Sequence, residues 1–188
     1  MSLVQAQAEE FNRKFMDPNI LYDYIWTKEE LDPYRKMYDD WKGEQSDPRR
    51  GDREVWVIDN NYPNPNKVTD AYRDHLPPLV ETQFMKSLNQ GFSVDNKLSK
   101  YSERQQYDWH CDASITWRNP KCDAWRRIIS SITYLNDDYE GGETEFLNDK
   151  ITPVSGKTVV FPSSYMYPHR GCPVTKGVKK IMVMHFWI

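Results

Sequence analysis

Cysteine and histidine are both scarce in this sequence, which has three cysteines and four histidines among its 188 residues. The cysteines stand at positions 111, 122 and 172, so they form no Cys-x-x-Cys pair and cannot all be joined to one another. The lack of a disulfide pattern predicts a reducing compartment. A zinc site built from cysteines and a histidine is a weak alternative, because such sites normally use closely spaced cysteine pairs.

Long apolar runs and a strong excess of one charge are also lacking. No run approaches the roughly 18 apolar residues typical of a membrane-spanning helix, and the first ten residues lack the basic start and apolar centre of a signal peptide. The formal net charge is −3, with acidic and basic residues interspersed, so a broad nucleic-acid-binding surface is not predicted. We therefore expect a soluble, cytoplasmic protein without a membrane partner, and nucleic acid is disfavoured as a ligand.

Aromatic side chains, in contrast, are abundant. They make up 14% of the chain and predict a folded protein with a sizeable apolar core. The length is close to that of one domain, so residues 1–188 are expected to form a single domain. Within it, residues 1–92 are expected to supply supporting helices and a long loop, and residues 93–188 a β-rich core.

Helices are predicted at three places in the N-terminal half. Apolar residues at helical spacing mark residues 3–15 as one helix. A second is expected over 33–43, with Asp32 as its N-cap and a proline at its first position, and a third over 77–91. The proline-rich stretch 59–78 is expected to be a long irregular connection, of the kind that often forms binding loops or lids.

After residue 92 the sequence changes to short β-type segments separated by Gly, Pro, Asn and Asp. The candidate strands are 93–101, 106–112, 126–135, 143–147, 157–161, 166–170 and 179–188. Helices followed by short strands predict an α+β, mainly β fold, in which helices cover one face of an antiparallel sheet and a second sheet completes a sandwich. The last segment is nearly all apolar, as expected for a central strand covered on both faces.

A His-x-Asp pair in the strand predicted over 106–112 is the clearest candidate for a metal site. Because side chains alternate along a strand, His110 and Asp112 point the same way and Cys111 points the other. His169, from a distant strand, would complete a 2-His-1-carboxylate face, which suits Fe(II) and leaves coordination positions open. The two remaining histidines are interpreted more simply, His185 as a core histidine and His75 as a solvated one.

Several motifs in the C-terminal half resemble those of Fe(II)- and 2-oxoglutarate-dependent dioxygenases of the prolyl 4-hydroxylase-like superfamily. They are two tyrosines before His-x-Asp, YLND at 134–137, EGGET at 140–144, GKTVVFP at 156–162, and His169 followed ten residues later by Lys179. The resemblance covers about half of the chain, from about residue 95 to its end. It implies a distorted double-stranded β-helix, or jelly roll, with N-terminal supporting helices.

The resemblance implies roles for four of these residues. His110, Asp112 and His169 would be the catalytic Fe(II) ligands, and Lys179 would pair with the C5 carboxylate of the cosubstrate 2-oxoglutarate. O2 would be the second cosubstrate, and ascorbate is a further candidate cofactor. Lysine at this place is a departure, because many relatives have arginine, which forms a bidentate fork where lysine offers a point charge.

Five further positions are implied as contacts. For the cosubstrate they are Tyr101, Tyr134 and Thr144, and for the substrate they are Arg127 and Tyr107. Strict alternation would place Arg127 and Tyr134 on opposite faces of one strand, so both can reach the cleft only if a bulge intervenes. Residues 113–126 are expected to form a variable loop at the mouth of the cleft.

The reaction implied is hydroxylation of a C–H bond with formation of succinate and CO2, and a prolyl or other peptidyl substrate is favoured. A small-metabolite hydroxylase of the same superfamily is the alternative within this chemistry. A catalytically silent jelly-roll binding module is a rival of another class. A zinc hydrolase with the same three ligands is another, and it would require Glu143 or Glu145 as general base.

Overall fold

The computed structural model describes residues 17–46, 51–58, 63–78, 91–113 and 126–188. The helix predicted over 3–15 and the body of the helix predicted over 77–91 lie outside the described residues, as does most of the predicted mouth loop. No helix within the described ranges is both long and apolar enough to cross a membrane.

The larger of two main sheets has seven antiparallel strands in the order β1-β11-β7-β14-β5-β4-β2. Their bounds are β1 Leu21–Tyr24, β2 Glu44–Gln45, β4 Glu54–Val57, β5 Ser93–Tyr101, β7 Arg127–Tyr134, β11 Lys157–Pro162 and β14 Lys179–Trp187. The pairing of β14 with β5 runs without interruption from Lys179–Tyr101 to Trp187–Ser93. This long, regular pairing makes β14 and β5 the centre of the sheet.

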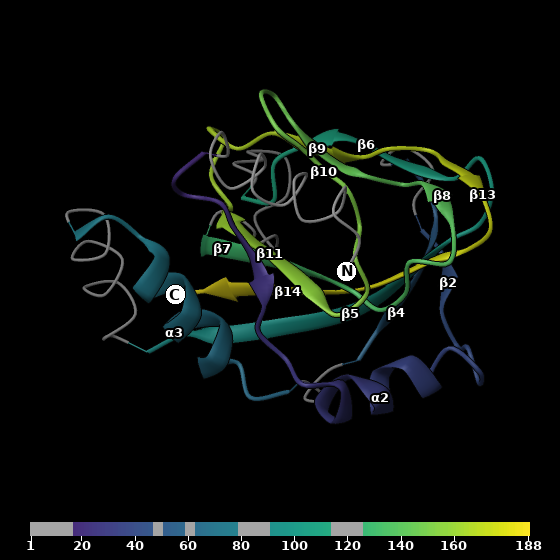
Figure 1. Cartoon of the computed structure of the whole chain (residues 1–188), viewed down its shortest axis with the longest axis horizontal. Coiled ribbons are helices and arrows are strands. Elements are labelled where there is room, and N and C mark those ends of the chain that lie inside the picture. Colours follow the sequence, from purple (N-terminus) through teal and green to yellow (C-terminus); the bar gives the residue numbers. More distant parts are fainter. Residues whose placement is uncertain (1–16, 47–50, 59–62, 79–90, 114–125) are drawn as a thin grey trace, which may run out of the picture.

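The smaller main sheet has five strands in the order β10-β9-β12-β6-β3. Their bounds are β3 Gly51–Asp52, β6 Gln106–His110, β9 Thr144–Phe146, β10 Lys150–Ile151 and β12 His169–Gly171. A separate pair joins β8 (Glu140–Gly141) to β13 (Val174–Lys176). Figure 1 shows the strands of the smaller sheet on one side of the larger sheet and the helices α2 and α3 on the other. A mainly β fold with antiparallel sheets and helices on one face is confirmed.

Strand β14 contributes to two apolar cores because its side chains alternate. Met182, Met184 and Phe186 pack in the core that also contains helix residues, whereas Ile181 and Val183 pack in the core between the sheets. All five are buried. The prediction of a central strand covered on both faces is therefore confirmed, and its inner face is available to form a site.

Helix α2 spans Lys28–Lys36, and the N-cap predicted for it is wrong. The N-cap is Thr27, whose side chain accepts a hydrogen bond from the Glu30 N–H, while the Glu30 carboxylate accepts one from the Thr27 N–H at 2.8 Å. Such a capping box satisfies two helix-end donors at once. Asp32 instead pairs with Arg35 at 3.0 Å inside the helix, and Pro33 is an interior residue.

Helix α3 spans Asn66–His75, where the sequence predicted an irregular connection. Val68, Tyr72 and Leu76 recur at four-residue spacing and are all buried in the core next to the large sheet. The Tyr72 hydroxyl also donates to the Asn19 carbonyl at 2.7 Å. Proline and asparagine around this stretch favoured a loop, but the apolar stripe prevails because it buries one helix face.

The predicted strands of the β-rich half are otherwise close to those observed. The segment 93–101 matches β5, and 157–161 and 179–188 differ from β11 and β14 by one residue. The segment 166–170 is the largest deviation, because β12 begins only at His169. This strand therefore starts at a histidine of the candidate metal site.

Candidate metal centre and its pocket

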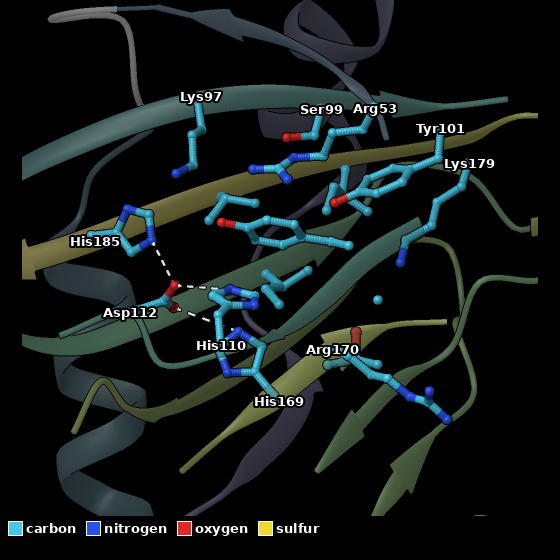
Figure 2. Close-up of a pocket in the computed structure, with 16 residues that line it drawn as sticks. Arg53, Lys97, Ser99, Tyr101, His110, Asp112, His169, Arg170, Lys179 and His185 are labelled. Carbon is cyan, nitrogen blue, oxygen red and sulfur yellow. Dashed lines mark ion pairs between the residues drawn. The ribbon is translucent and has the colours of Figure 1, made fainter. Parts of the chain in front are cut away.

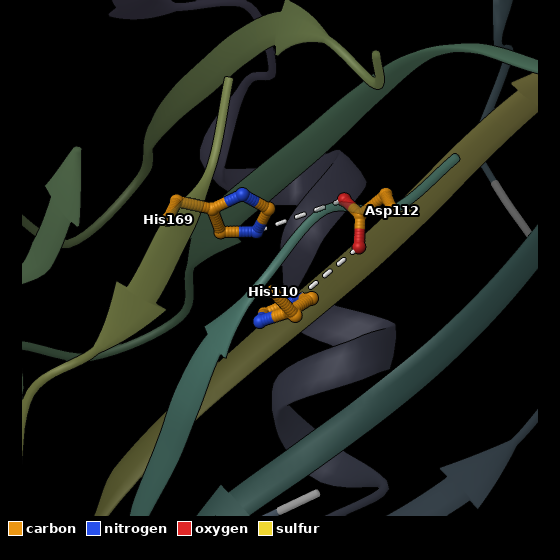
Figure 3. A group of neighbouring side chains, drawn as sticks. All are labelled: His110, Asp112 and His169. Atoms are coloured by element: carbon orange, nitrogen blue, oxygen red, sulfur yellow. Dashed lines mark ion pairs between the residues drawn. The ribbon is translucent and has the colours of Figure 1, made fainter. Parts of the chain in front are cut away.

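Two histidines meet across neighbouring strands of the smaller sheet. His110 ends β6, His169 begins β12, and the antiparallel pairing places them directly opposite each other. Residues paired in this way present their side chains on the same face, with Cβ atoms close together. Asp112 follows two residues after His110 and turns its carboxylate toward both imidazoles, as Figure 3 shows.

The donor atoms of these three side chains converge. One ligand atom from each of His110, Asp112 and His169 lies within 4.8 Å of the others. The Nε2 atom of His110 is 3.3 Å from Asp112 Oδ1, and that of His169 is 3.7 Å from Asp112 Oδ2. The structure thus brings together the three residues that the sequence singled out.

Backbone carbonyls orient both imidazoles. His110 Nδ1 lies 2.8 Å from the Asp108 carbonyl oxygen, and His169 Nδ1 lies 3.2 Å from that of Tyr167. A carbonyl oxygen can only accept, so each Nδ1 carries the proton and each Nε2 keeps its lone pair. This is the arrangement in which a second hydrogen bond fixes a metal-binding histidine.

The protonation states also suit metal binding. Burial lowers the pKa of His169 to about 4, so its imidazole is neutral near pH 7. Burial alone would raise the pKa of Asp112, but the imidazoles of His185, His169 and His110 beside it hold this pKa well below its usual range. A neutral imidazole and an ionised carboxylate are the forms that bind a divalent cation.

His185 lies against this cluster, a position that the sequence did not reveal. Its side chain is buried as predicted, with 1% exposure, but its Nδ1 is 2.6 Å from Asp95 Oδ1 and its Nε2 is 3.6 Å from Asp112 Oδ1. Figure 2 shows it beside Asp112 at one end of the pocket. Side chains alternate along β14, so Lys179 and His185 lie on the same face of the sheet. This pattern in the sequence could have identified His185 as a neighbour of the site.

A pocket of about 450 Å³, including its open mouth, lies in front of the three residues. Four of the predicted contacts line it, namely Tyr101, Tyr107, Thr144 and Lys179. Tyr134 is not among the described residues that line the pocket, but its hydroxyl donates to Thr144 Oγ1 at 2.6 Å. Tyr134 therefore acts on the pocket through Thr144.

Lys179 is an unusual feature of this pocket because it is a buried cation. Its side chain is 2% exposed, and its Nζ donates to the Gly142 carbonyl at 2.7 Å and lies 5.1 Å from the centre of the Tyr101 ring. No carboxylate among the described residues lies within ion-pair distance of it, and burial lowers its pKa to about 8. A buried ammonium group without a counterion predicts an anionic ligand.

Arg127 was expected to contact the substrate, and that role stays a prediction. The pairing of β7 with β14 contains a bulge between Arg127 and Ile129, so the bulge that the prediction required is present. However, the Arg127 guanidinium pairs with Asp95 at 2.9 Å and donates to the Asp112 carbonyl at 3.3 Å. It supports the Asp112 segment from behind, and it is not among the described residues that line the pocket.

Neither of the two glutamates considered as the general base of a hydrolase lies beside the three candidate ligands. Glu145 pairs with Arg170 at 2.7 Å, and Glu143 faces Lys150 at 3.7 Å. Neither lines the described part of the pocket. The candidate cluster also contains no cysteine from the described part of the chain, and Cys172 donates to Glu145 instead. The geometry thus gives no support to the zinc alternatives.

Comparisons with known proteins agree with this geometry. Residues 96–188 match the family described as the 2OG-Fe(II) oxygenase superfamily. A PKHD-type hydroxylase of Alteromonas mediterranea is 38% identical over 85 residues, which are 42% of this chain and 37% of that protein. The chain therefore spans well under two thirds of this curated relative.

Two solved structures resemble almost the whole chain. A prolyl-4-hydroxylase of Pseudomonas putida has a TM-score of 0.63 at 18% identity, covering 90% of this chain and 92% of its own. The viral collagen prolyl hydroxylase of Paramecium bursaria chlorella virus 1, solved with 2OG, has a TM-score of 0.61 at 20% identity, covering 89% and 95%. These likenesses establish a shared fold. The family match shows that residues 96–188 belong to the 2OG-Fe(II) oxygenase superfamily.

Proposed function

We propose that the chain is a non-haem Fe(II)- and 2-oxoglutarate-dependent dioxygenase that hydroxylates a C–H bond of a prolyl or other peptidyl substrate. The observation that carries the proposal is one pocket with a 2-His-1-carboxylate cluster at one end and, at the other, a buried lysine that has no carboxylate partner among the described residues. A chelating 2-oxo acid with a distal carboxylate has the chemistry to use both ends. Prolyl hydroxylases among the structural neighbours support the substrate class.

His110, Asp112 and His169 are the proposed metal ligands. Their donor set of two neutral imidazoles and one carboxylate suits Fe(II) and leaves positions free on one face. When bound, iron and 2-oxoglutarate together supply the oxidant for hydroxylation, with succinate and CO2 as the coproducts. The residues around them hold the reactants in place and exclude water, which is the usual division of labour between protein and cofactor.

Lys179 is the proposed partner of the distal carboxylate. Because it is already desolvated, its ammonium group would form a charge-assisted hydrogen bond without a further desolvation cost. Thr144, fixed by the Tyr134 hydroxyl at 2.6 Å, offers a hydroxyl at the same end. The ring of Tyr101 lies 5.1 Å from the Lys179 Nζ and lines the pocket.

The two facing sheets are proposed to form the distorted double-stranded β-helix of this superfamily. His110 and His169 come from the smaller sheet, whereas Lys179 and Tyr101 come from the larger one. The reaction space is therefore the gap between the sheets. Helices α2 and α3 pack on the far side of the larger sheet and support it without entering the pocket.

The test is O2-dependent conversion of 2-oxoglutarate to succinate by the Fe(II)-loaded protein. His110→Ala is expected to reduce succinate formation to background, because a two-ligand site cannot hold the metal. His75→Ala, which alters an exposed histidine on α3, serves as the matched control and should behave as wild type. Undiminished turnover in His110→Ala would contradict the proposal.

A second experiment, which measures binding of metal and 2-oxoglutarate, distinguishes an enzyme from a silent binding module. Lys179→Met is expected to weaken 2-oxoglutarate binding to the Mn(II)-loaded protein by more than tenfold, the scale of one lost charge-assisted hydrogen bond. Lys176→Met, at an exposed lysine, is the control. Folded wild-type protein that binds neither Mn(II) nor 2-oxoglutarate would leave the binding module as the better interpretation.

A further inference from the structure

A second cationic group lies in the pocket, apart from Lys179. Arg53 follows strand β3, and its guanidinium packs on the Tyr107 ring with Cζ 3.5 Å from the ring centre. The residue is 6% exposed and lines the pocket. Its Nε and Nη1 atoms are buried and have no hydrogen-bond partner among the described residues. Figure 2 shows this guanidinium pointing into the pocket.

Lys97 lines the pocket near Arg53. It lies on β5 with its side chain on the same face as Ser99 and Tyr101, and Figure 2 shows its amine directed into the pocket toward the end where Asp112 lies. Burial lowers its pKa to about 8, and Asp112 and Arg53 act on it electrostatically. Within the described ranges, no carboxylate forms an ion pair with it.

The charges of the pocket do not balance, even when the proposed metal and cosubstrate are counted. Arg53, Lys97 and Lys179 are cationic, whereas Arg170 is neutralised by Glu145 at 2.7 Å. Asp112 is the single carboxylate among the described lining residues, and it offsets one of the two charges of a divalent metal. Dianionic 2-oxoglutarate then leaves an excess of positive charge near Arg53 and Lys97. Uncompensated buried charge is unfavourable, so a further anion is expected there.

We propose that Arg53 and Lys97 form a subsite for a carboxylate of the substrate, so the residue that is oxidised is the C-terminal residue of a peptide or, for the small-metabolite alternative, a free amino acid. This inference rests on the proposed function. An internal residue of a polypeptide presents only neutral amides on either side and would leave the excess charge in place. A guanidinium held against an aromatic ring can present its fork of donors to a carboxylate in the bidentate geometry that such pairs prefer.

The position of this subsite suits a substrate that also reaches the proposed metal ligands. The pocket together with its open mouth has a volume of about 450 Å³, and 2-oxoglutarate must share this space. Arg53 and Tyr107 stand together on one wall, so a substrate carboxylate at Arg53 would place the rest of a small molecule toward His110, whose ring is 3.9 Å from that of Tyr107. The subsite is therefore close enough to position a C–H bond near the metal.

The experiment compares acids with their amides. The twenty standard L-amino acids and the corresponding amides are titrated singly into protein loaded with Mn(II) and 2-oxoglutarate under nitrogen, with binding measured by calorimetry. At least one acid is expected to bind more than about tenfold more tightly than its amide, as for a lost hydrogen bond to a charged group. If every acid binds no more tightly than its amide, or if none binds, the carboxylate subsite is refuted.

Substitutions test whether Arg53 and Lys97 cause the preference for acids over amides. Arg53→Met and Lys97→Met should each reduce the acid-over-amide ratio by about tenfold or more, and Arg53→Lys should restore part of it. Affinity for 2-oxoglutarate should stay at the wild-type value in all three. Arg73→Met, on the outer face of α3, is the matched control. A ratio that survives in Arg53→Met, or a loss of 2-oxoglutarate binding there, would overturn the assignment.

The titrations distinguish an absent carboxylate subsite from an absent dioxygenase site. If Arg53 and Lys97 bind no carboxylate, metal binding and succinate formation stay intact, while acids and amides bind equally. Failure of the proposed function appears as absent metal or 2-oxoglutarate binding in the titrations that precede the acid and amide series. A melting curve recorded for each variant shows whether it is folded before its affinities are compared.

Discussion

Individual side chains of the candidate metal centre are held by a second layer of partners. Carbonyl groups fix both imidazoles, and Asp112 is held through its own backbone by Arg127 and through its carboxylate by His185. His185 is in turn held by Asp95 at 2.6 Å. Such outer partners set the direction of a ligand, and a loosely held ligand costs metal affinity.

His185→Phe is therefore expected to weaken metal binding although His185 is not a proposed ligand. The expected loss is about 10- to 100-fold in affinity, the usual cost of removing an outer partner. Titration of the ligand-free protein with Mn(II) or Co(II) measures it directly. Met184→Leu, on the opposite face of the same strand, is the control, and equal affinities in the two variants would contradict a positioning role.

Burial of Lys179 makes the stability of the folded protein depend on pH. Lys179 has a pKa of about 8 in the folded chain and 10.5 when unfolded, so the unfolded state holds more protons between these values. Stability of the ligand-free protein should therefore rise as pH increases from about 8 to 10.5, by up to about 3 kcal/mol from this group. Lys97 contributes a rise of the same sign.

Lys179→Met removes one of the two contributions. The variant is expected to be more stable than wild type near pH 7 and to show a smaller rise between pH 8 and 10.5, as measured by urea unfolding at each pH. Addition of 2-oxoglutarate should reverse the order, because wild type alone gains the carboxylate partner. An identical pH dependence in wild type and variant would exclude Lys179 as a source.

Elements of the fold differ in how directly their sequence specifies them. Strand β14 alternates between two apolar cores, so its face toward the pocket follows from its place in the sheet. Helix α2 depends instead on its first turn, where Thr27 and Glu30 satisfy each other. Its two buried side chains, Leu31 and Tyr34, attach it to the large sheet.

Two substitutions in α2 distinguish the observed cap from the one that the sequence suggested. Thr27→Ala is expected to lower the free energy of unfolding by about 1 kcal/mol, because the Glu30 N–H loses its side-chain acceptor. Asp32→Ala removes only a half-exposed pair with Arg35 and should cost a few tenths of a kcal/mol. Urea denaturation of both variants measures the difference, and the reverse order would favour the original assignment.

The whole molecule joins two sheets through a shared pocket. The proposed metal ligands lie on the smaller sheet, and the proposed cosubstrate lysine lies on the larger one. A metal and a dianion bound together would therefore bridge the two layers. The pair of ligands would add to the apolar core and to links such as the Tyr134–Thr144 hydrogen bond, so ligands should contribute measurably to stability.

Binding of Mn(II) and 2-oxoglutarate is expected to raise the melting temperature. Ligand at one hundred times its dissociation constant adds about 2.7 kcal/mol to the free energy of unfolding. In His110→Ala the shift should be lost for both ligands, whereas in Lys179→Met it should be lost for 2-oxoglutarate alone. Differential scanning fluorimetry resolves these cases, and equal shifts in both variants would contradict a bridged site.

The sequence predicted the β-rich half of the molecule better than the helical half. Alternation and turn residues located β5, β11 and β14 to within one residue, and the spacing of His110 and Asp112 was enough to nominate the cluster. Helix α3 was missed because proline and asparagine outweighed a three-residue apolar stripe. Arg53 could not be found from sequence, because its role depends on a fold that brings residue 53 against Tyr107.

The direct pairing of His110 with His169 has a consequence for how the chain reaches its native state. If β12 slid by a single position along β6, one imidazole would swing to the opposite side of the sheet. Only the correctly aligned strands can then coordinate a cation with both imidazoles. A bound ion would therefore stabilise the native register of β12 against β6 and none of the shifted registers.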